Sequence, residues 1–134
     1  MKNTEIHTFR LKPRQDLFTS IERFVHEKGI DAGAVLAGVG SLTNATLRLA
    51  NREYYTSYEG FFEIVSLTGT VSTHGSHLHI SISDGEGKTL GGHLVEGCLI
   101  YTTAEIVIAA FEDIRYTREM CEESGYEELV VREK

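Results

Sequence analysis

The sequence has 134 residues, of which 41% are hydrophobic and 25% charged, and this balance is typical of a soluble globular protein with a single domain, residues 1–134. The net charge of −7 disfavours a large surface for binding nucleic-acid phosphates. No stretch of about 18 apolar residues predicts a transmembrane helix, and the N-terminus, MKNTEIHTFRLK, lacks the apolar core of a signal peptide, so we expect a cytoplasmic protein.

The first half of the chain predicts a strand, a helix and then a series of strands. Residues 4–11 have the composition of a strand, which Pro13 ends. Asp16 suits a helix N-cap, apolar residues then recur at helical spacing, and Gly29 suits the position after the helix; together they predict a helix at about 16–28. The predicted strands that follow are 33–42, 45–50, 53–58 and 61–72.

The second half of the chain predicts two strands around a glycine-rich turn. A long strand at 99–110 follows, and residues 127–131 would form a closing edge strand. Seven or eight strands with one main helix predict an α+β fold, in which the helix packs on a mostly antiparallel sheet.

Strict alternation of apolar and polar residues marks positions 77–83, with the sequence HLHISIS. On a strand, Leu78, Ile80 and Ile82 would point to the core, while His77 and His79 would share the opposite face. Their Cα atoms would lie about 6.6 Å apart. This spacing lets both imidazoles bind one small ion.

The length of the next turn decides whether His93 joins this pair. A five-residue turn at 84–88 pairs Ser83 with Thr89, and therefore His79 with His93 on one face. It also buries Leu94 beside the core strand. A four-residue turn would instead bury His93 and expose Leu94. Because burying the leucine is favourable, we predict the five-residue turn.

Three neutral imidazoles on one rigid sheet face make an open transition-metal site. We predict His77, His79 and His93 as ligands of zinc or a similar divalent metal, with water or an exogenous group in the fourth position. These donors do not separate zinc from nickel or cobalt. The alternative is that all three are ordinary polar strand residues. Gly91 and Gly92 leave room there for a ligand or for a close backbone.

Other motifs do not lead to a complete active site. Gly87-Lys88-Thr89 resembles the end of a Walker loop but lacks its first glycine and its helix, so we predict no nucleotide cofactor. The catalytic residues therefore stay unknown. Glu105, in an apolar strand, is either a general base near the metal or a satisfied structural carboxylate, and we favour the structural interpretation.

Four stretches together resemble the PPC (plant and prokaryote conserved) domain family: GVGSLTNATLR at 38–48, EGFFEIVSLTGTVS at 59–72, HLHISISDGEGKTLGGHLVEGCLIYTTAEIVI at 77–108 and YTREMCEESGYEELVV at 116–131. The resemblance covers nearly the whole chain and implies an antiparallel α+β subunit that assembles as a homotrimer. In some members histidines of this hairpin hold a metal, and His77, His79 and His93 match those positions. Stand-alone prokaryotic members have no firmly assigned activity.

The resemblance also raises DNA binding, which the charges do not support. In plant relatives the domain follows an AT-hook, and many prokaryotic members carry a DNA-binding label by similarity. This sequence has no basic Arg-Gly-Arg-type segment, and only Lys2 and residues 10–14 are mildly basic. The homotrimer has separate support from surface that a single sheet layer would leave uncovered. The strand at 61–72 begins apolar on both faces, and small residues recur at 32–40.

Three functions are compatible with these features. The first is a binding or regulatory module with a histidine metal site. The second is a zinc-dependent enzyme that acts on a small molecule, with Glu105 as the candidate base. The third is a DNA-binding regulator. We favour the first, because the site lacks a full catalytic set.

Overall fold

The computed structural model describes residues 3–134 and shows, within them, one helix and eight strands. The predicted α+β class is therefore confirmed. In chain order the elements are β1 (Thr4–Leu11), α1 (Leu17–Lys28), β2 (Gly33–Arg48), β3 (Thr56–Val71), β4 (His77–Ser83), β5 (Thr89–Leu94), β6 (Ile100–Phe111), β7 (Ile114–Met120) and β8 (Glu127–Glu133).

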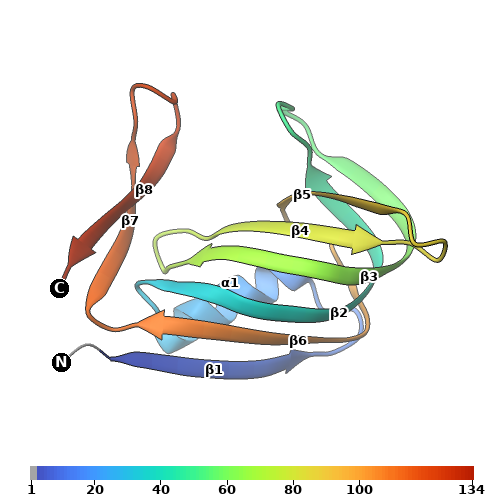
Figure 1. Ribbon diagram of the computed structural model, residues 1–134, viewed down its shortest axis with the longest axis horizontal. Coiled ribbons are helices and arrows are strands. Elements are labelled where there is room, and N and C mark those ends of the chain that lie inside the picture. Colours follow the sequence, from blue (N-terminus) through green and yellow to red (C-terminus); the bar gives the residue numbers. More distant parts are fainter. Residues whose placement is uncertain (1–2) are drawn as a thin grey trace.

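Six strands form one antiparallel sheet in the order β1-β6-β2-β3-β4-β5 (Figure 1). β5 also pairs with the end of β2, where Leu47 lies opposite Leu94 and Arg48 opposite His93. The sheet thus curls until β5 meets β2. Both histidine-bearing strands therefore have a hydrogen-bonded neighbour on each side, which fixes their position.

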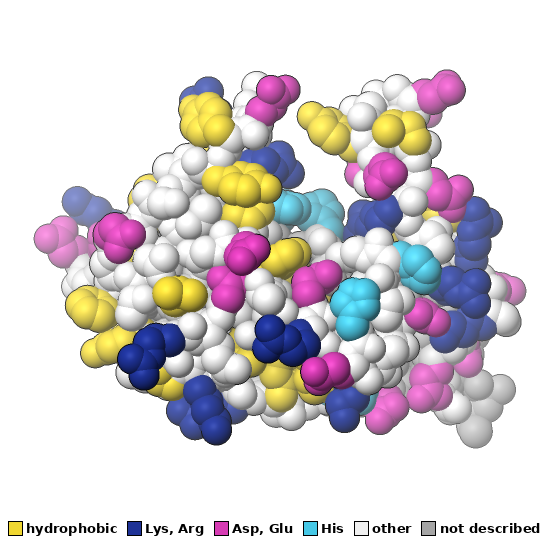
Figure 2. Space-filling view, turned by 180° about the vertical axis from the view of Figure 1, so that it is seen from behind, with side chains coloured by type: hydrophobic (Ala, Val, Ile, Leu, Met, Phe, Trp, Pro, Cys, Tyr) yellow, Lys and Arg dark blue, Asp and Glu magenta, His cyan; other side chains and the backbone are white. Residues whose placement is uncertain are grey.

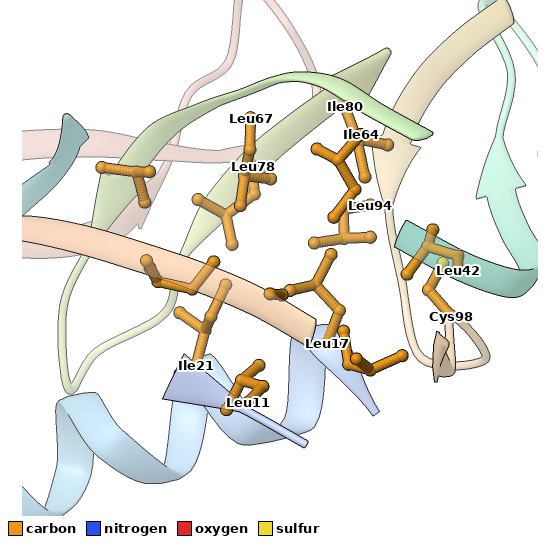
Figure 3. Close-up of a cluster of buried hydrophobic side chains, with 14 of the residues drawn as sticks. Leu11, Leu17, Ile21, Leu42, Ile64, Leu67, Leu78, Ile80, Leu94 and Cys98 are labelled. Atoms are coloured by element: carbon orange, nitrogen blue, oxygen red, sulfur yellow. The ribbon is translucent and has the colours of Figure 1, made fainter. Parts of the chain in front are cut away.

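Helix α1 begins and ends as its sequence predicts. The Asp16 carboxylate accepts a hydrogen bond of 2.9 Å from the Thr19 N–H, and Gly29 adopts the left-handed conformation with φ 62°. The apolar stripe of Leu17, Ile21 and Val25 is fully buried. Figure 3 shows Leu17 and Ile21 pointing from α1 toward the core residues of the sheet. This helix is too short and too polar to cross a bilayer, and the described residues contain no other helix.

The strands between residues 33 and 72 are longer than predicted. The predicted strands 33–42 and 45–50 are one strand, β2, and the predicted strands 53–58 and 61–72 merge into β3. A register shift between Leu42 and Asn44 absorbs the irregular position without ending the pairing of β2 with β3. The predicted strands 45–50 and 53–58 imply a turn at residues 51–52, and the structure has a turn there, in which Asn51 adopts φ 58°.

The predicted edge strand at 127–131 is present as part of β8 (Glu127–Glu133), but it does not close the main sheet. β8 pairs only with β7, and the two form a separate two-stranded sheet that rises beside the main sheet (Figure 1). β7 was not predicted. Its sequence, IRYTREM, mixes polar and apolar residues without the alternation that indicates a strand. A second raised hairpin, formed by the ends of β2 and β3, lies on the other side of the histidine strands (Figure 1).

Candidate metal centre

Strand β4 divides its side chains between two faces, as its alternation predicts. Leu78, Ile80 and Ile82 are at most 2% exposed and belong to the main core. His77 and His79 are exposed on the opposite face. The pleat of a strand requires this separation, so burial of the three apolar residues fixes the direction of both imidazoles.

The turn at 84–88 has the predicted five residues. The Asp84 carboxylate accepts hydrogen bonds from the N–H groups of Glu86 at 2.9 Å and Lys88 at 3.0 Å. Gly87 closes the turn with φ 82°, a conformation that suits glycine. The side chain of Asp84 therefore organises the turn from inside, and the turn sets the register of β5.

The predicted register is confirmed. Ser83 pairs with Thr89, and His79 pairs with His93. Leu94, the residue after His93, is fully buried. A slip of one residue would exchange the faces of His93 and Leu94, so burial of Leu94 keeps His93 on the side of the other two histidines.

The three histidines lie close enough together to share one ion. Each offers a ring nitrogen, and these atoms lie within 4.8 Å of one another. The ring centroids are 5.0 Å apart for His77 and His79, 5.1 Å for His77 and His93, and 5.7 Å for His79 and His93. Three nitrogens bound to one tetrahedral zinc ion lie about 3.4 Å apart, a distance that small rotations of the exposed rings would reach.

The surroundings of His93 also fit a metal ligand. Its Nδ1 atom is buried and has no hydrogen-bond partner. A buried polar atom without a partner costs free energy, and coordination by a metal ion would remove that cost. The residues present therefore fit a divalent transition metal.

Electrostatics keep two of the histidines neutral, which is the form that binds a metal. Burial, followed by the positive charge of Arg48, lowers the pKa of His93 from 6.5 to about 4. Burial, followed by the neighbouring His79 and by Arg118, lowers the pKa of His77 below its usual value. Neither imidazole needs to lose a proton before it binds a metal at neutral pH.

Glycines beside the site serve close backbone packing, the second of the two roles considered for Gly91 and Gly92. A Cβ atom at Gly91 would lie 2.4 Å from the carbonyl oxygen of Ile80, and one at Gly92 would lie 2.9 Å from that of Arg48. A larger residue at either position would push β5 away from β4 or β2.

An open pocket of about 620 Å³ lies next to the histidines. His77 and His93 contribute to its lining, Asn51 comes from the β2–β3 hairpin, and Tyr126 comes from the β7–β8 hairpin. Figure 2 shows histidine side chains in the hollow between the two raised hairpins, with basic side chains on both sides. This volume is in the range of sites for small ligands.

Two arginines of this pocket were missed by the sequence reasoning. Arg48 lies opposite His93 in the ladder between β2 and β5 and therefore shares its face. Arg118 comes from β7 and donates a hydrogen bond of 3.1 Å to the Thr70 hydroxyl on β3. No sequence signal pairs residue 48 with residue 93, because closure of the sheet brings them together.

Glu105 lies away from this site. It is an exposed residue of β6, paired with Arg10 on β1 and Val39 on β2. Strands β2 and β3 lie between β6 and β4 in the sheet, and Glu105 does not line the pocket. Its position gives the role of a base near the metal no support. No ion pair of its side chain is found among residues 3–134, so the role of a satisfied structural carboxylate has no support either.

The chain is similar in sequence to part of a longer protein. The bifunctional protein GlmU of Synechococcus sp. (strain JA-3-3Ab) is 45% identical over 124 residues, which are 92% of this chain and 20% of that protein. The chain thus spans about a fifth of the length of this relative.

Two solved structures are similar over almost the whole chain. A hypothetical protein from Salmonella cholerae-suis superposes with a TM-score of 0.97 at 37% identity and covers 100% of this chain and 97% of its own. A protein described as metal-containing, from Archaeoglobus fulgidus, superposes with a TM-score of 0.83 at 25% identity, with 94% and 93% covered. Residues 1–112 match the profile of the Plants and Prokaryotes Conserved (PCC) domain, the family called PPC above. The chain belongs to the Plants and Prokaryotes Conserved domain family.

Proposed function

We propose that this chain is a cytoplasmic metal-binding module that assembles as a homotrimer and serves binding or regulation. His77, His79 and His93 would hold a divalent transition metal, and their nitrogen donors suit zinc. The observation that carries this proposal is the approach of three ring nitrogens to within 4.8 Å on a rigid strand pair. A bound metal would supply a Lewis acid that attracts an oxygen-containing ligand. The similar protein from Archaeoglobus fulgidus, which is described as metal-containing, supports the metal-binding part of this proposal.

Metal analysis of protein purified without chelators tests the site. We expect about one zinc equivalent per chain, and we expect His79→Ala to lower zinc affinity at least about a hundredfold, since even the supporting partners of metal ligands matter 10- to 100-fold. His26→Ala is the matched control, because His26 is an exposed histidine of α1 outside the cluster. A preparation that carries no metal and ignores added zinc would contradict the proposal.

The homotrimer is supported by apolar side chains that this subunit leaves exposed. Val65 on β3 is 58% exposed, and Phe61, 64% exposed, contacts Tyr101 at a centroid distance of 4.8 Å. On β2, Leu36 and Val39 are also exposed. Large apolar patches on a soluble subunit mark interaction surfaces, and identical subunits close them symmetrically.

Light scattering after gel filtration tests this assembly. We expect a mass three times that of the 14.9 kDa chain, and we expect Val65→Lys to reduce it. Glu123→Lys, at an exposed residue of the β7–β8 turn away from this apolar surface, is the control for the added charge. A wild-type mass of one chain would exclude the trimer.

A zinc-dependent enzyme is the second candidate, because a pocket of about 620 Å³ adjoins the histidine cluster. No catalytic base is assigned. Turnover by the zinc-loaded protein that disappears in His79→Ala would favour this candidate over a binding module.

DNA binding is a third possibility that the charges oppose, since the chain has a net charge of −7 and the pocket includes Glu127 and Glu128. Strong binding to duplex DNA at physiological salt, which weakens steeply as the salt concentration rises, would favour the DNA-binding function instead.

A further inference from the structure

Two arginines line the pocket beside the histidine cluster. Arg48 and Arg118 line it together with His77 and His93. These residues come from four different strands, β2, β7, β4 and β5. Only the folded chain brings them together, so the pocket combines a metal-binding cluster with two guanidinium groups.

Arg118 is held in place at this pocket. Its Nη2 atom donates to the Thr70 hydroxyl at 3.1 Å, and Thr70 is the residue that pairs with His77 between β3 and β4. Gly75 faces the aliphatic part of Arg118, since a Cβ there would lie 3.7 Å from Arg118 Cγ. One described hydrogen bond uses only one of five N–H donors, so the guanidinium keeps donors for a ligand.

Neither arginine has a carboxylate partner among residues 3–134. The ion pairs found there involve His7, Lys88, Lys134 and Arg132 instead. Both Arg48 and Arg118 are half-buried. A half-buried guanidinium without a counter-ion loses hydration without gaining a partner, and a bound anion would supply that partner.

The acidic residues of the pocket limit the kind of anion. Glu127 and Glu128 also line the pocket, on the β7–β8 hairpin, and both are exposed. A polyanion would meet these carboxylates as well as the arginines. A small molecule with one carboxylate can reach the arginines and the metal while the rest of the molecule lies toward the acidic side.

We propose that the pocket binds a small organic carboxylate, whose oxygen atoms contact the metal held by His77, His79 and His93 and accept hydrogen bonds from Arg48 and Arg118. This inference rests on the proposed metal site and names the ligand class for it. Guanidinium groups bind carboxylates through paired hydrogen bonds, and a three-histidine site leaves a coordination position open for an oxygen ligand. Phosphate shares the negative oxygen atoms, so the test includes it.

Cobalt-substituted protein tests the proposal, because the visible spectrum of Co²⁺ reports changes in its ligands. Cobalt content is measured first, by equilibrium dialysis, and lactate and inorganic phosphate are then titrated separately. We expect lactate to shift the spectrum. We expect Arg48→Gln and Arg118→Gln each to weaken lactate binding about tenfold or more while cobalt content stays the same, as loss of a charged hydrogen bond implies.

The controls separate this proposal from the metal site itself. Arg52→Gln changes an arginine of the β2–β3 hairpin that does not line the pocket, and it should bind lactate like the wild type. Arg118→Lys keeps the charge but not the paired donors, so it should restore only part of the affinity. Circular dichroism checks that each variant is folded, and Arg48→Gln tests the proposal without touching the β7–β8 hairpin.

Each outcome has a distinct meaning. A wild-type protein that binds no cobalt excludes the metal site, and the carboxylate proposal fails with it. A loaded protein whose spectrum ignores lactate excludes the carboxylate proposal alone. So does a response to phosphate without a response to lactate, or equal lactate affinity in the wild type and in both glutamine variants.

Discussion

Acidification should destabilise the metal-free protein through His93. Burial lowers the pKa of this imidazole from 6.5 to about 4 in the folded chain. Between these two values the unfolded chain binds a proton that the folded chain does not. The free energy of unfolding rises with pH wherever the unfolded state binds more protons than the folded state. It therefore decreases as the pH falls below 6.5.

The size of this effect follows from the two pKa values. A group that titrates at 6.5 unfolded and at about 4 folded would cost about 2.5 kcal/mol by pH 4.5. Because His93 is only half-buried, solvent screening reduces this to about 1–2 kcal/mol. The lowered pKa of Asp31 acts at more acidic pH, below its ordinary value of 3.8. The lowered pKa of Glu119 acts at and below its ordinary value of 4.5, at the acidic end of this window, and the lowered pKa of His77 acts in the same window as that of His93.

Urea unfolding of metal-free protein at pH 7.5, 6.5, 5.5 and 4.5 measures the effect. We expect the free energy of unfolding to fall across this range, and the fall should be about 1–2 kcal/mol smaller in His93→Gln. His26→Gln, on the exposed face of α1, should show the wild-type fall. Equal falls in the wild type and in His93→Gln would refute the reasoning, because the slope would then come from other groups.

Three further changes test the framework that holds the site. Asp16→Ala removes the N-cap of α1 at the Thr19 N–H and the acceptor of the Gly97 and Cys98 N–H groups, which lie at 2.7 and 3.1 Å. Urea unfolding should show that the free energy of unfolding falls by about 2–3 kcal/mol, and a fall below about 0.5 kcal/mol would contradict this role. Gly69→Ala would place a Cβ atom 1.9 Å from the His77 carbonyl oxygen, so zinc titration should show weaker binding, whereas Gly85→Ala, in open space, should bind normally. One glycine inserted after Gly85 should leave zinc binding unchanged, because burial of Leu94 and the pairing of β5 with β2 keep the faces of β5 while the exposed turn lengthens by one residue; loss of zinc binding would show that the turn length alone fixes the register.

The centre of the fold could be predicted because local physics decides it. Asp16 and Gly29 are residue types that begin and end helices, so both ends of α1 could be predicted from the sequence. The helix runs from Leu17 to Lys28. Residues 77–94 form two strands around a turn whose length follows from burying Leu94. Each of these predictions needs only neighbours within about 20 residues.

The remaining parts depend on contacts between distant residues. The sequence suggests a break within β2 and another within β3. The two strands nevertheless remain paired on both sides of their irregular positions, so each is one continuous strand. β7 and β8 pair only with each other, and their polar sequences resemble a solvated loop. The strand at 127–131 could be predicted, but its partner could not, because a strand pattern does not say which other strand will pair with it.

The same distinction separates the histidine cluster from the pocket around it. The cluster needs one hairpin, because β4 and β5 carry all three imidazoles and their turn sets the register. The pocket needs two more connections, the pairing of Arg48 with His93 and the hydrogen bond from Arg118 to Thr70. A chain with the same hairpin on another framework would keep the three nitrogens and lose both guanidinium groups. Metal affinity and ligand choice are therefore set by different parts of this chain, and substitutions at Arg48 or Arg118 should change the ligand without changing the metal.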